Sequence, residues 1–210
     1  MNKKTIVFLV SACCIIGCSK SHIVTQEVKA NWYTMADFPA DGRQNSIAFA
    51  IDGKGYVGLG RANGDYRDLW QYDPQWNSWT KKASYPGFDI PVTYFIINTK
   101  AYILIKSRAN EKSELWEYDP STNRWNEKTD FPGKNIFYAS SFSIGNKGYM
   151  VVASNGSTLK KDFWEYDPSK NKWKKRADFP GNPMDSPVGF TIEDKGYFAL
   201  GNYPEKESKS

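Results

Sequence analysis

FWEYDPSKNKW, the stretch at residues 163–173, decides the fold because it occurs twice more in nearly the same form. LWQYDPQWNSW fills residues 69–79, and LWEYDPSTNRW fills residues 115–125. In each copy an Asp-Pro-x-x-Asn segment separates two short strand-like runs. Proline presets φ for a type I turn, aspartate can accept from the backbone two residues on, and asparagine tolerates the left-handed conformation that closes such a loop. We therefore expect a β-hairpin rather than a calcium loop, because no acidic cluster accompanies the phrase.

Three other phrases recur around this hairpin in a fixed order. One runs from a tryptophan to an aromatic residue followed by proline; the others are a β-branched and aromatic stretch such as VTYFII and a tyrosine-led apolar stretch. The tryptophans of the first phrase are spaced by 47, 46 and 48 residues and are Trp32, Trp79, Trp125 and Trp173. Each unit thus supplies four strand-like segments. In the first unit they are residues 46–51, 55–59, 68–72 and 78–82. Four antiparallel strands in a unit of this length are typical of one blade of a β-propeller.

Over residues 32–203 the sequence resembles the kelch and galactose-oxidase-type propeller family, and within it bacterial kelch-like lipoproteins. The likeness rests on repeated phrases such as FWEYDP at residues 163–168 and ADFPG at residues 177–181. It implies an all-β fold built from four-stranded antiparallel blades. The sequence departs from the family where two glycines usually follow the second strand, because the second unit has Ile105-Lys106 there and the third has Val152-Ala153.

The number of units is small for a propeller. Three units, which begin near Ser46, Val92 and Ser140, are complete, whereas a fourth begins near Pro187 and stops near residue 203, before its third strand. Residues 204–210 are charged and are expected to be a disordered tail. We favour an incomplete or truncated propeller, an open arc, over a small ring closed by the tryptophan phrase at residue 32. The exposed edges of such an arc predict that the protein self-associates or is unstable.

The N-terminal segment MNKKTIVFLVSACCIIGC, residues 1–18, is typical of a signal peptide, with two lysines before a short apolar run. Its end resembles the bacterial lipobox, which implies that Cys18 is lipidated and becomes the new N-terminus. The alternative is an ordinary signal peptide in which this cysteine is incidental. If Cys18 is lipidated, residues 19–31 form a polar tether, and the protein is anchored at the bacterial cell envelope, in the outer membrane or facing the periplasm.

Several kinds of chemistry are excluded by residue content. All three cysteines precede residue 19, and the one histidine, His22, precedes the repeats, so the blades have neither a thiolate metal site nor the copper ligands of galactose oxidase. We expect no metal and no cofactor, and no catalytic residue is assigned. The formal charge of +5 comes without a dense basic patch, which argues against a nucleic-acid partner.

The loops that differ between units indicate where a ligand would bind. The loops that join strands two and three and the loops that join blades fall on one face of a meander blade, and binding residues usually lie on such loops. The alternative is that these loops vary because nothing constrains them. Candidate ligand-face residues are Arg43, Tyr66, Arg67, Phe88, Arg108, Phe137 and Tyr138.

These observations lead to one main hypothesis and two alternatives. The main hypothesis is a non-catalytic, lipid-anchored propeller that binds a protein or glycan at the cell envelope. The resemblance to kelch proteins also implies a carbohydrate-active epimerase or mutarotase, similar to sialic acid mutarotase. The third hypothesis is a truncated, inactive remnant.

Overall fold

The computed structural model describes residues 5–9, 31–107, 112–133, 136–154, 158–180 and 186–199. In these residues the regular structure consists of β-strands. The strands are β1 (Thr5–Leu9), β2 (Asn31–Met35), β3 (Ile47–Ile51), β4 (Lys54–Gly58), β5 (Leu69–Asp73), β6 (Ser78–Lys82), β7 (Ile90–Ile97), β8 (Lys100–Lys106), β9 (Ser113–Asp119), β10 (Arg124–Glu127), β11 (Tyr138–Ile144), β12 (Lys147–Ser154), β13 (Phe163–Asp167), β14 (Lys172–Lys175), β15 (Val188–Ile192) and β16 (Lys195–Ala199).

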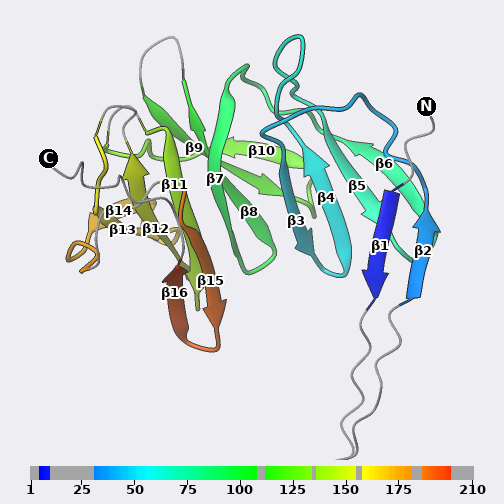
Figure 1. Cartoon of the computed structure of the whole chain (residues 1–210). Helices are drawn as coiled ribbons and strands as arrows, with labels where there is room; N and C mark the ends of the chain where they lie inside the picture. The colour runs from blue at the N-terminus through cyan, green and yellow to red at the C-terminus, as the bar shows by residue number, and fades with distance from the viewer. Residues whose placement is uncertain are drawn as a thin grey trace, which may run out of the picture.

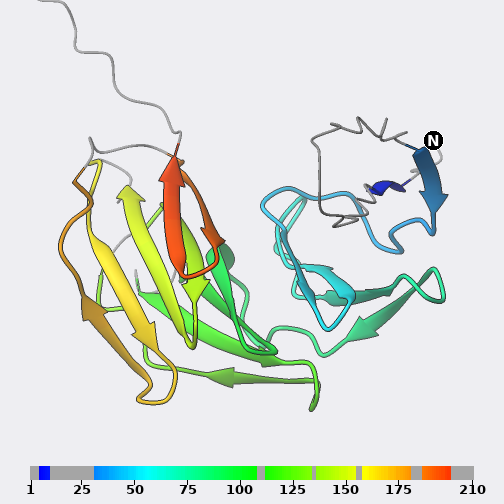
Figure 2. The same cartoon turned by 90° about the horizontal axis from the view of Figure 1, so that it is seen from below.

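Three four-stranded antiparallel meanders form the body of the molecule. They are β3 to β6, β7 to β10 and β11 to β14, and β15 and β16 pair as the first two strands of a further unit. The first strands lie beside one another, with β7 between β3 and β11 and with β15 next to β11. Figure 1 shows the sheets arranged around a common centre, and Figure 2 shows them from below as an open arc. The expectation of three complete propeller blades and a partial fourth is confirmed.

The Asp-Pro-x-x-Asn hairpins form as expected. Asn77, Asn123 and Asn171 all have positive φ, between 46° and 53°. In the second blade the Tyr118 hydroxyl donates to Asn123 Oδ1 at 2.9 Å, and the Ser121 N–H donates to Asp119 Oδ1 at the same distance. Because proline, aspartate and asparagine act within their own turn, this element depends on few distant contacts.

Aromatic side chains fill the space between blades. In the second blade Phe95 stacks on Tyr102, with ring centres 5.7 Å apart, and Tyr166 of the third blade packs on both rings. Phe49 stacks on Tyr56 of the first blade in the same way. The buried tyrosines of the complete blades are therefore core residues that join one blade to the next; they are Tyr56, Tyr102, Tyr118 and Tyr166.

The second and third blades lack the glycines that follow the second strand of the first blade, and their second strands are longer. In the first blade Leu59 and Gly60 both have positive φ, and β4 ends at Gly58. Without these glycines, β8 continues to Lys106 and β12 continues to Ser154. This extension carries the end of β8 further toward the loop face of the arc.

At the N-terminal end, β1 pairs with β2 so that Phe8 lies opposite Trp32. Residues 10–30, with Cys18 and the predicted tether, lie outside the described residues, as does the predicted tail at 204–210. Nothing described here is a helix with the length and apolar character needed to span a bilayer. The signal peptide and the lipid anchor therefore stay predictions.

Candidate functional site

A pocket of about 620 Å³ opens between the three complete blades on the side of the variable loops. It lies where the first strands β3, β7 and β11 begin, together with the exit of the second strands in the first two blades. Its lining residues are Asn45, Ser46, Ile47, Arg61, Ile90, Pro91, Val92, Thr93, Tyr94, Lys106, Ile136, Phe137 and Tyr138.

The charged side chains that line this pocket, which we call the axial pocket, are cationic. Arg61 and Lys106 are the ionised side chains of its described lining, which contains no carboxylate. Uncharged polar groups come from Asn45, Ser46, Thr93 and two tyrosines, and apolar surface comes from the β7 residues and Phe137. A pocket with two cations, several hydroxyl groups and an apolar wall suits an anionic, hydroxyl-bearing ligand of small size.

The two pocket tyrosines differ in their surroundings. The Tyr94 hydroxyl donates to the backbone carbonyl of Ala48 in the neighbouring blade. Burial raises the pKa of this phenol, so Tyr94 stays protonated at neutral pH and acts as a link between blades. Tyr138 is 49% exposed at the start of β11, where its hydroxyl can reach a bound ligand.

Two of the ligand-face residues predicted from the sequence line this pocket. They are Phe137 and Tyr138, and the Lys106 ammonium lies 3.1 Å from the centre of the Phe137 ring. Arg67 and Phe88 form a separate pair on the same side, with the guanidinium 4.3 Å from the ring centre. Arg108 lies outside the described residues.

Arg43 and Tyr66 lie in a different pocket, of about 590 Å³, at the edge of the first blade. Arg43 forms an ion pair with Asp68, donates to the Leu59 carbonyl and lies 3.9 Å from the centre of the Tyr66 ring. Its side chain is only 3% exposed. Its hydrogen-bonding groups hold the loop before β3 against the start of β5, which is a structural role.

Arg61 and Lys106 were not among the predicted site residues. Both stand at the exit of a second strand, Arg61 just after β4 and Lys106 as the last residue of β8. That shared place in the repeat is the signal that could have identified them. Their convergence depends on the curvature of the arc, which the spacing of the repeats does not give.

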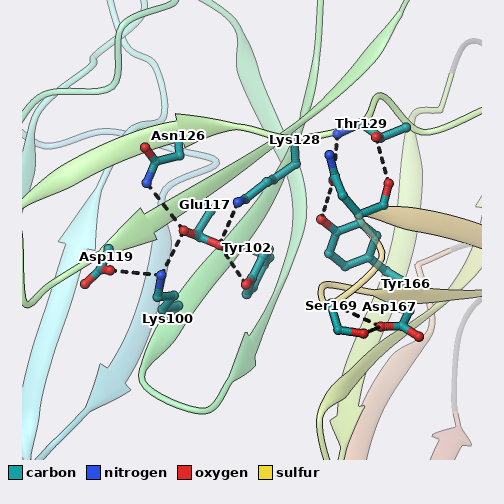
Figure 3. A network of polar contacts seen from close by, with 11 residues as sticks. Lys100, Tyr102, Glu117, Asp119, Asn126, Lys128, Thr129, Tyr166, Asp167 and Ser169 are labelled. Carbon is teal, nitrogen blue, oxygen red and sulfur yellow. Dashed lines mark hydrogen bonds and ion pairs between the residues drawn. The ribbon is translucent and has the colours of Figure 1, made fainter.

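A buried carboxylate at Glu117 is the most connected polar group near the core (Figure 3). It accepts from Lys100 at 3.0 Å and from the Tyr102 hydroxyl at 2.8 Å, and its other ion pair is with Lys128 at 3.1 Å. Burial alone would raise the pKa of Glu117, but these three donors outweigh it and hold the pKa below its ordinary value. Glu165 is bound similarly in the third blade, so the network belongs to the repeat rather than to a site.

Metal chemistry finds no support in the described residues. No group of three His, Cys, Asp or Glu side chains there is arranged to hold a metal ion.

The repeated Tyr-Asp-Pro hairpins, the four-stranded antiparallel blades and the pocket between first strands define a kelch-type β-propeller of the galactose-oxidase-like class. In sequence the chain is similar to the N-acetylneuraminate epimerase of Yersinia enterocolitica, with 33% identity over 76 residues that make up 32% of this chain and 19% of that protein. The N-acetylneuraminate epimerase of Yersinia pestis is 30% identical over a stretch of the same length. The match thus spans about a fifth of the length of these relatives.

Among solved structures, that of YjhT superposes with a TM-score of 0.65 at 22% identity, covering 82% of this chain and 64% of that one. This likeness shows the fold. No protein-family model matches the chain.

Proposed function

We propose that this chain is a carbohydrate-active propeller whose axial pocket binds an acidic sugar of the N-acetylneuraminate type. The observation that carries the proposal is the pairing of Arg61 and Lys106 in a pocket whose described lining holds no carboxylate. A sugar carboxylate placed between the two cations would form charge-assisted hydrogen bonds, which are stronger than neutral ones. The similarity to N-acetylneuraminate epimerases supports the same class of ligand.

The remaining lining suits the rest of such a ligand. Ser46 and Asn45 offer donors and acceptors for sugar hydroxyl and amide groups, whereas the Thr93 hydroxyl is hydrogen-bonded to Ser141 Oγ at 2.7 Å and offers only an acceptor. The Phe137 ring, which is 49% exposed, offers a flat apolar surface for the C–H face of the ring. Orientation would then come from a few polar contacts inside a largely apolar wall, as in most small-ligand sites.

Epimerisation at the anomeric carbon needs two proton transfers. The anomeric hydroxyl loses a proton while the bond between the anomeric carbon and the ring oxygen breaks and that oxygen gains a proton; reclosure on the other face of the carbonyl reverses both transfers. A positioned acid or base accelerates such steps by about 10²–10⁴-fold. Tyr138 and Lys106 carry the protons that can reach the ligand, because Tyr94 is committed to the Ala48 carbonyl.

The proposal is tested with freshly dissolved N-acetylneuraminate, whose interconversion of anomers is followed by proton NMR. The chain should accelerate interconversion above the buffer rate. Arg61→Gln and Lys106→Met should each weaken binding by about 10- to 100-fold, the cost of a lost charge-assisted hydrogen bond. Tyr138→Phe should lower the rate while leaving binding nearly unchanged.

Lys170→Met is the charge-matched control, because Lys170 lies on the hairpin between β13 and β14, at the opposite end of the blade from the pocket. Unchanged binding and rate are expected for this variant. If the chain neither binds nor interconverts the sugar, the proposal is wrong and the inactive remnant is the better hypothesis. Equal effects of Lys170→Met and Lys106→Met would also contradict it.

A non-catalytic binding module for a glycan or protein is the second candidate. It is favoured by one observation: the described lining pairs no carboxylate or histidine with the cations, so it lacks the side chains that can accept a proton as free bases at neutral pH. In the same NMR experiment, saturation transfer to the sugar without faster interconversion would support the binding module over the epimerase.

We also propose that Cys18 is lipidated and that residues 19–31 tether the blades to the cell envelope. The support is the sequence alone: two lysines, an apolar run and Ile-Ile-Gly-Cys at residues 15–18. Labelled fatty acid should be incorporated into the wild-type chain and not into Cys18→Ala, which should leave the membrane fraction. Equal labelling of both would refute the anchor.

A further inference from the structure

One contact recurs at three successive interfaces between repeat units. The indole N–H of a fourth-strand tryptophan donates to a backbone carbonyl just after the fourth strand of the preceding unit. These bonds are Trp79 to Ala36 at 3.1 Å, Trp125 to Ala83 at 2.8 Å and Trp173 to Thr129 at 3.2 Å. Because the donor and the acceptor position are the same in all three copies, this hydrogen bond is a repeated feature of the packing of one unit against the next.

Two residues after each acceptor carbonyl, an aromatic residue adds a second contact between the units. It packs edge-on against the third- and fourth-strand tryptophans of the next blade, with ring centres 5.0 to 6.3 Å apart. The aromatic residues are Phe38, Tyr85 and Phe131. Edge-to-face pairs of this kind add about 0.5–1.5 kcal/mol each beyond the area that they bury.

The fourth copy of this arrangement faces an apolar groove. After β14, Ala177 and Phe179 occupy the positions of Ala83 and Tyr85 in the repeat, and both line a groove of about 610 Å³. Aromatic rings on β11, β12, β13 and β16 form its walls: Phe142, Tyr149, Phe163 and Phe198. In the described residues, the Ala177 carbonyl accepts no indole N–H of the kind that Ala36 and Ala83 accept.

The aromatic walls of the groove resemble those of the interface between the second and third blades. Phe142 stacks on Tyr149 with ring centres 5.6 Å apart, as Phe95 stacks on Tyr102 at 5.7 Å. On the second-blade pair, Trp173 of the next blade packs edge-on against Phe95 at 6.2 Å. The groove therefore has the walls that elsewhere receive a fourth-strand tryptophan.

The chain carries one further fourth-strand phrase, at β2. Trp32 stands 47 residues before Trp79 in the repeat, and it is 65% exposed, next to Tyr33 at 54%. β2 and the β15–β16 pair lie at the two ends of the arc (Figure 2), and no described strand pairing joins them. A tryptophan phrase and a groove that fits it thus stand at opposite ends of one molecule.

We propose that β2 of a second copy of this chain occupies the groove, with its Trp32 indole N–H donating to the Ala177 carbonyl. The interface continues the contact already made three times inside each molecule. Because groove and strand are different surfaces, the contact is head-to-tail, and two copies joined in this way can close on each other through two such contacts.

The intermolecular contact is weaker than the internal ones. Inside the molecule an asparagine two residues before the tryptophan accepts from the same backbone site: Asn77 accepts the Ala36 N–H at 2.7 Å, and Asn123 accepts the Ala83 N–H at 2.9 Å. In the β2 phrase that position is Ala30, so this second hydrogen bond is lost. Association of β2 with the groove is therefore reversible, whereas the internal interfaces hold the fold.

The experiment places a photoreactive benzoylphenylalanine at position 32 of the full chain, in place of Trp32. Purified chains with ¹⁴N and with ¹⁵N are mixed in mild detergent and illuminated, and the cross-linked peptides are identified by mass. The expected product joins position 32 of one isotope to groove residues 177–179 or 196–198 of the other. Phe179→Ser and Ala177→Glu in the acceptor chain should each lower its yield by about tenfold, since about 1.4 kcal/mol corresponds to that factor.

The control probe replaces Trp76, which is 72% exposed on the first hairpin and outside the groove. It should give no product with residues 177–179 or 196–198. Circular dichroism on the same samples checks that the acceptor variants stay folded. Products of a single isotope only, an equal yield from position 76, or a yield that neither acceptor variant changes would overturn the proposal.

Discussion

Replacing Glu117 with glutamine tests how much the buried charge network stabilises the central blade. The glutamine amide has the same shape, and its oxygen can still accept the Tyr102 hydroxyl, now 2.8 Å from the carboxylate. What is lost is the negative charge facing Lys100 and Lys128, at 3.0 Å and 3.1 Å. The first blade has Gln71 at the corresponding place, hydrogen-bonded to Tyr56, so the fold accepts this side chain.

The size of the effect follows from the exposure of the partners. A hydrogen bond to a charged group contributes about 1–1.5 kcal/mol more than a neutral one. The Lys100 and Lys128 side chains are 36% and 24% exposed, so water screens part of this difference. Lys100 also keeps its ion pair with Asp119 at 2.9 Å. We expect Glu117→Gln to lower the free energy of unfolding by about 2 kcal/mol at pH 7, which moves a urea midpoint by about 1 M.

The pH dependence identifies the cause. The pKa of Glu117 is lowered in the folded protein, so its contribution is complete above the unfolded pKa of about 4.3 and is lost as pH falls through the folded value. Urea titrations of wild type and variant should therefore converge toward pH 3. Glu127→Gln, at an exposed position of β10, should match wild type at every pH. A difference that persists undiminished at pH 3 would refute the electrostatic explanation.

Three further changes test the interfaces and turns. Trp125→Phe removes the indole N–H that donates to the Ala83 carbonyl at 2.8 Å and should cost about 1 kcal/mol in thermal unfolding, with Trp76→Ala as the unchanged control. Asn123→Ala places alanine at φ 53° and removes the acceptor of the Ala83 N–H, so urea unfolding should show a loss of about 2 kcal/mol, and Asn123→Gly should lose less. Gly148→Ala places a methyl group against the Phe95 ring of the neighbouring blade and should cost about 1–3 kcal/mol by the same measurement; a neutral result would mean that the ring moves freely.

The elements that the sequence predicts well are those with local causes. The turn at Asp119 and Asn123 needs only its own proline, carboxylate and amide, and it forms as expected. Blade stacking is also predictable, because the tryptophan spacing repeats along the chain and each indole meets the equivalent carbonyl. Because the sequence repeats, the contacts between units repeat as well, so a turn that is predicted correctly also fixes the prediction of the blade around it.

The site is less predictable because it depends on contacts between distant residues. From the sequence, Arg43 is predicted to be a loop cation that can bind a ligand. In the structure it forms an ion pair with Asp68, which lies 25 residues away in the sequence. Arg61 reads as one charged residue among many, yet it shares a pocket with Lys106 of the next blade. Loop position predicts which face is variable, but the tertiary arrangement decides which of its charges face a ligand.

The axial pocket and the edge groove have no lining residue in common, since the first is built from residues 45–138 and the second from residues 142–198. Three complete blades are therefore enough to form the pocket, whatever covers the groove. Ala177→Glu should lower the yield of the position-32 cross-link by about tenfold while leaving N-acetylneuraminate binding within about twofold of wild type. Arg61→Gln should weaken sugar binding by about 10- to 100-fold and leave the cross-link yield unchanged. If Ala177→Glu weakened sugar binding as strongly as Arg61→Gln does, the pocket would need the second copy to hold its shape, and the two proposals could not be independent.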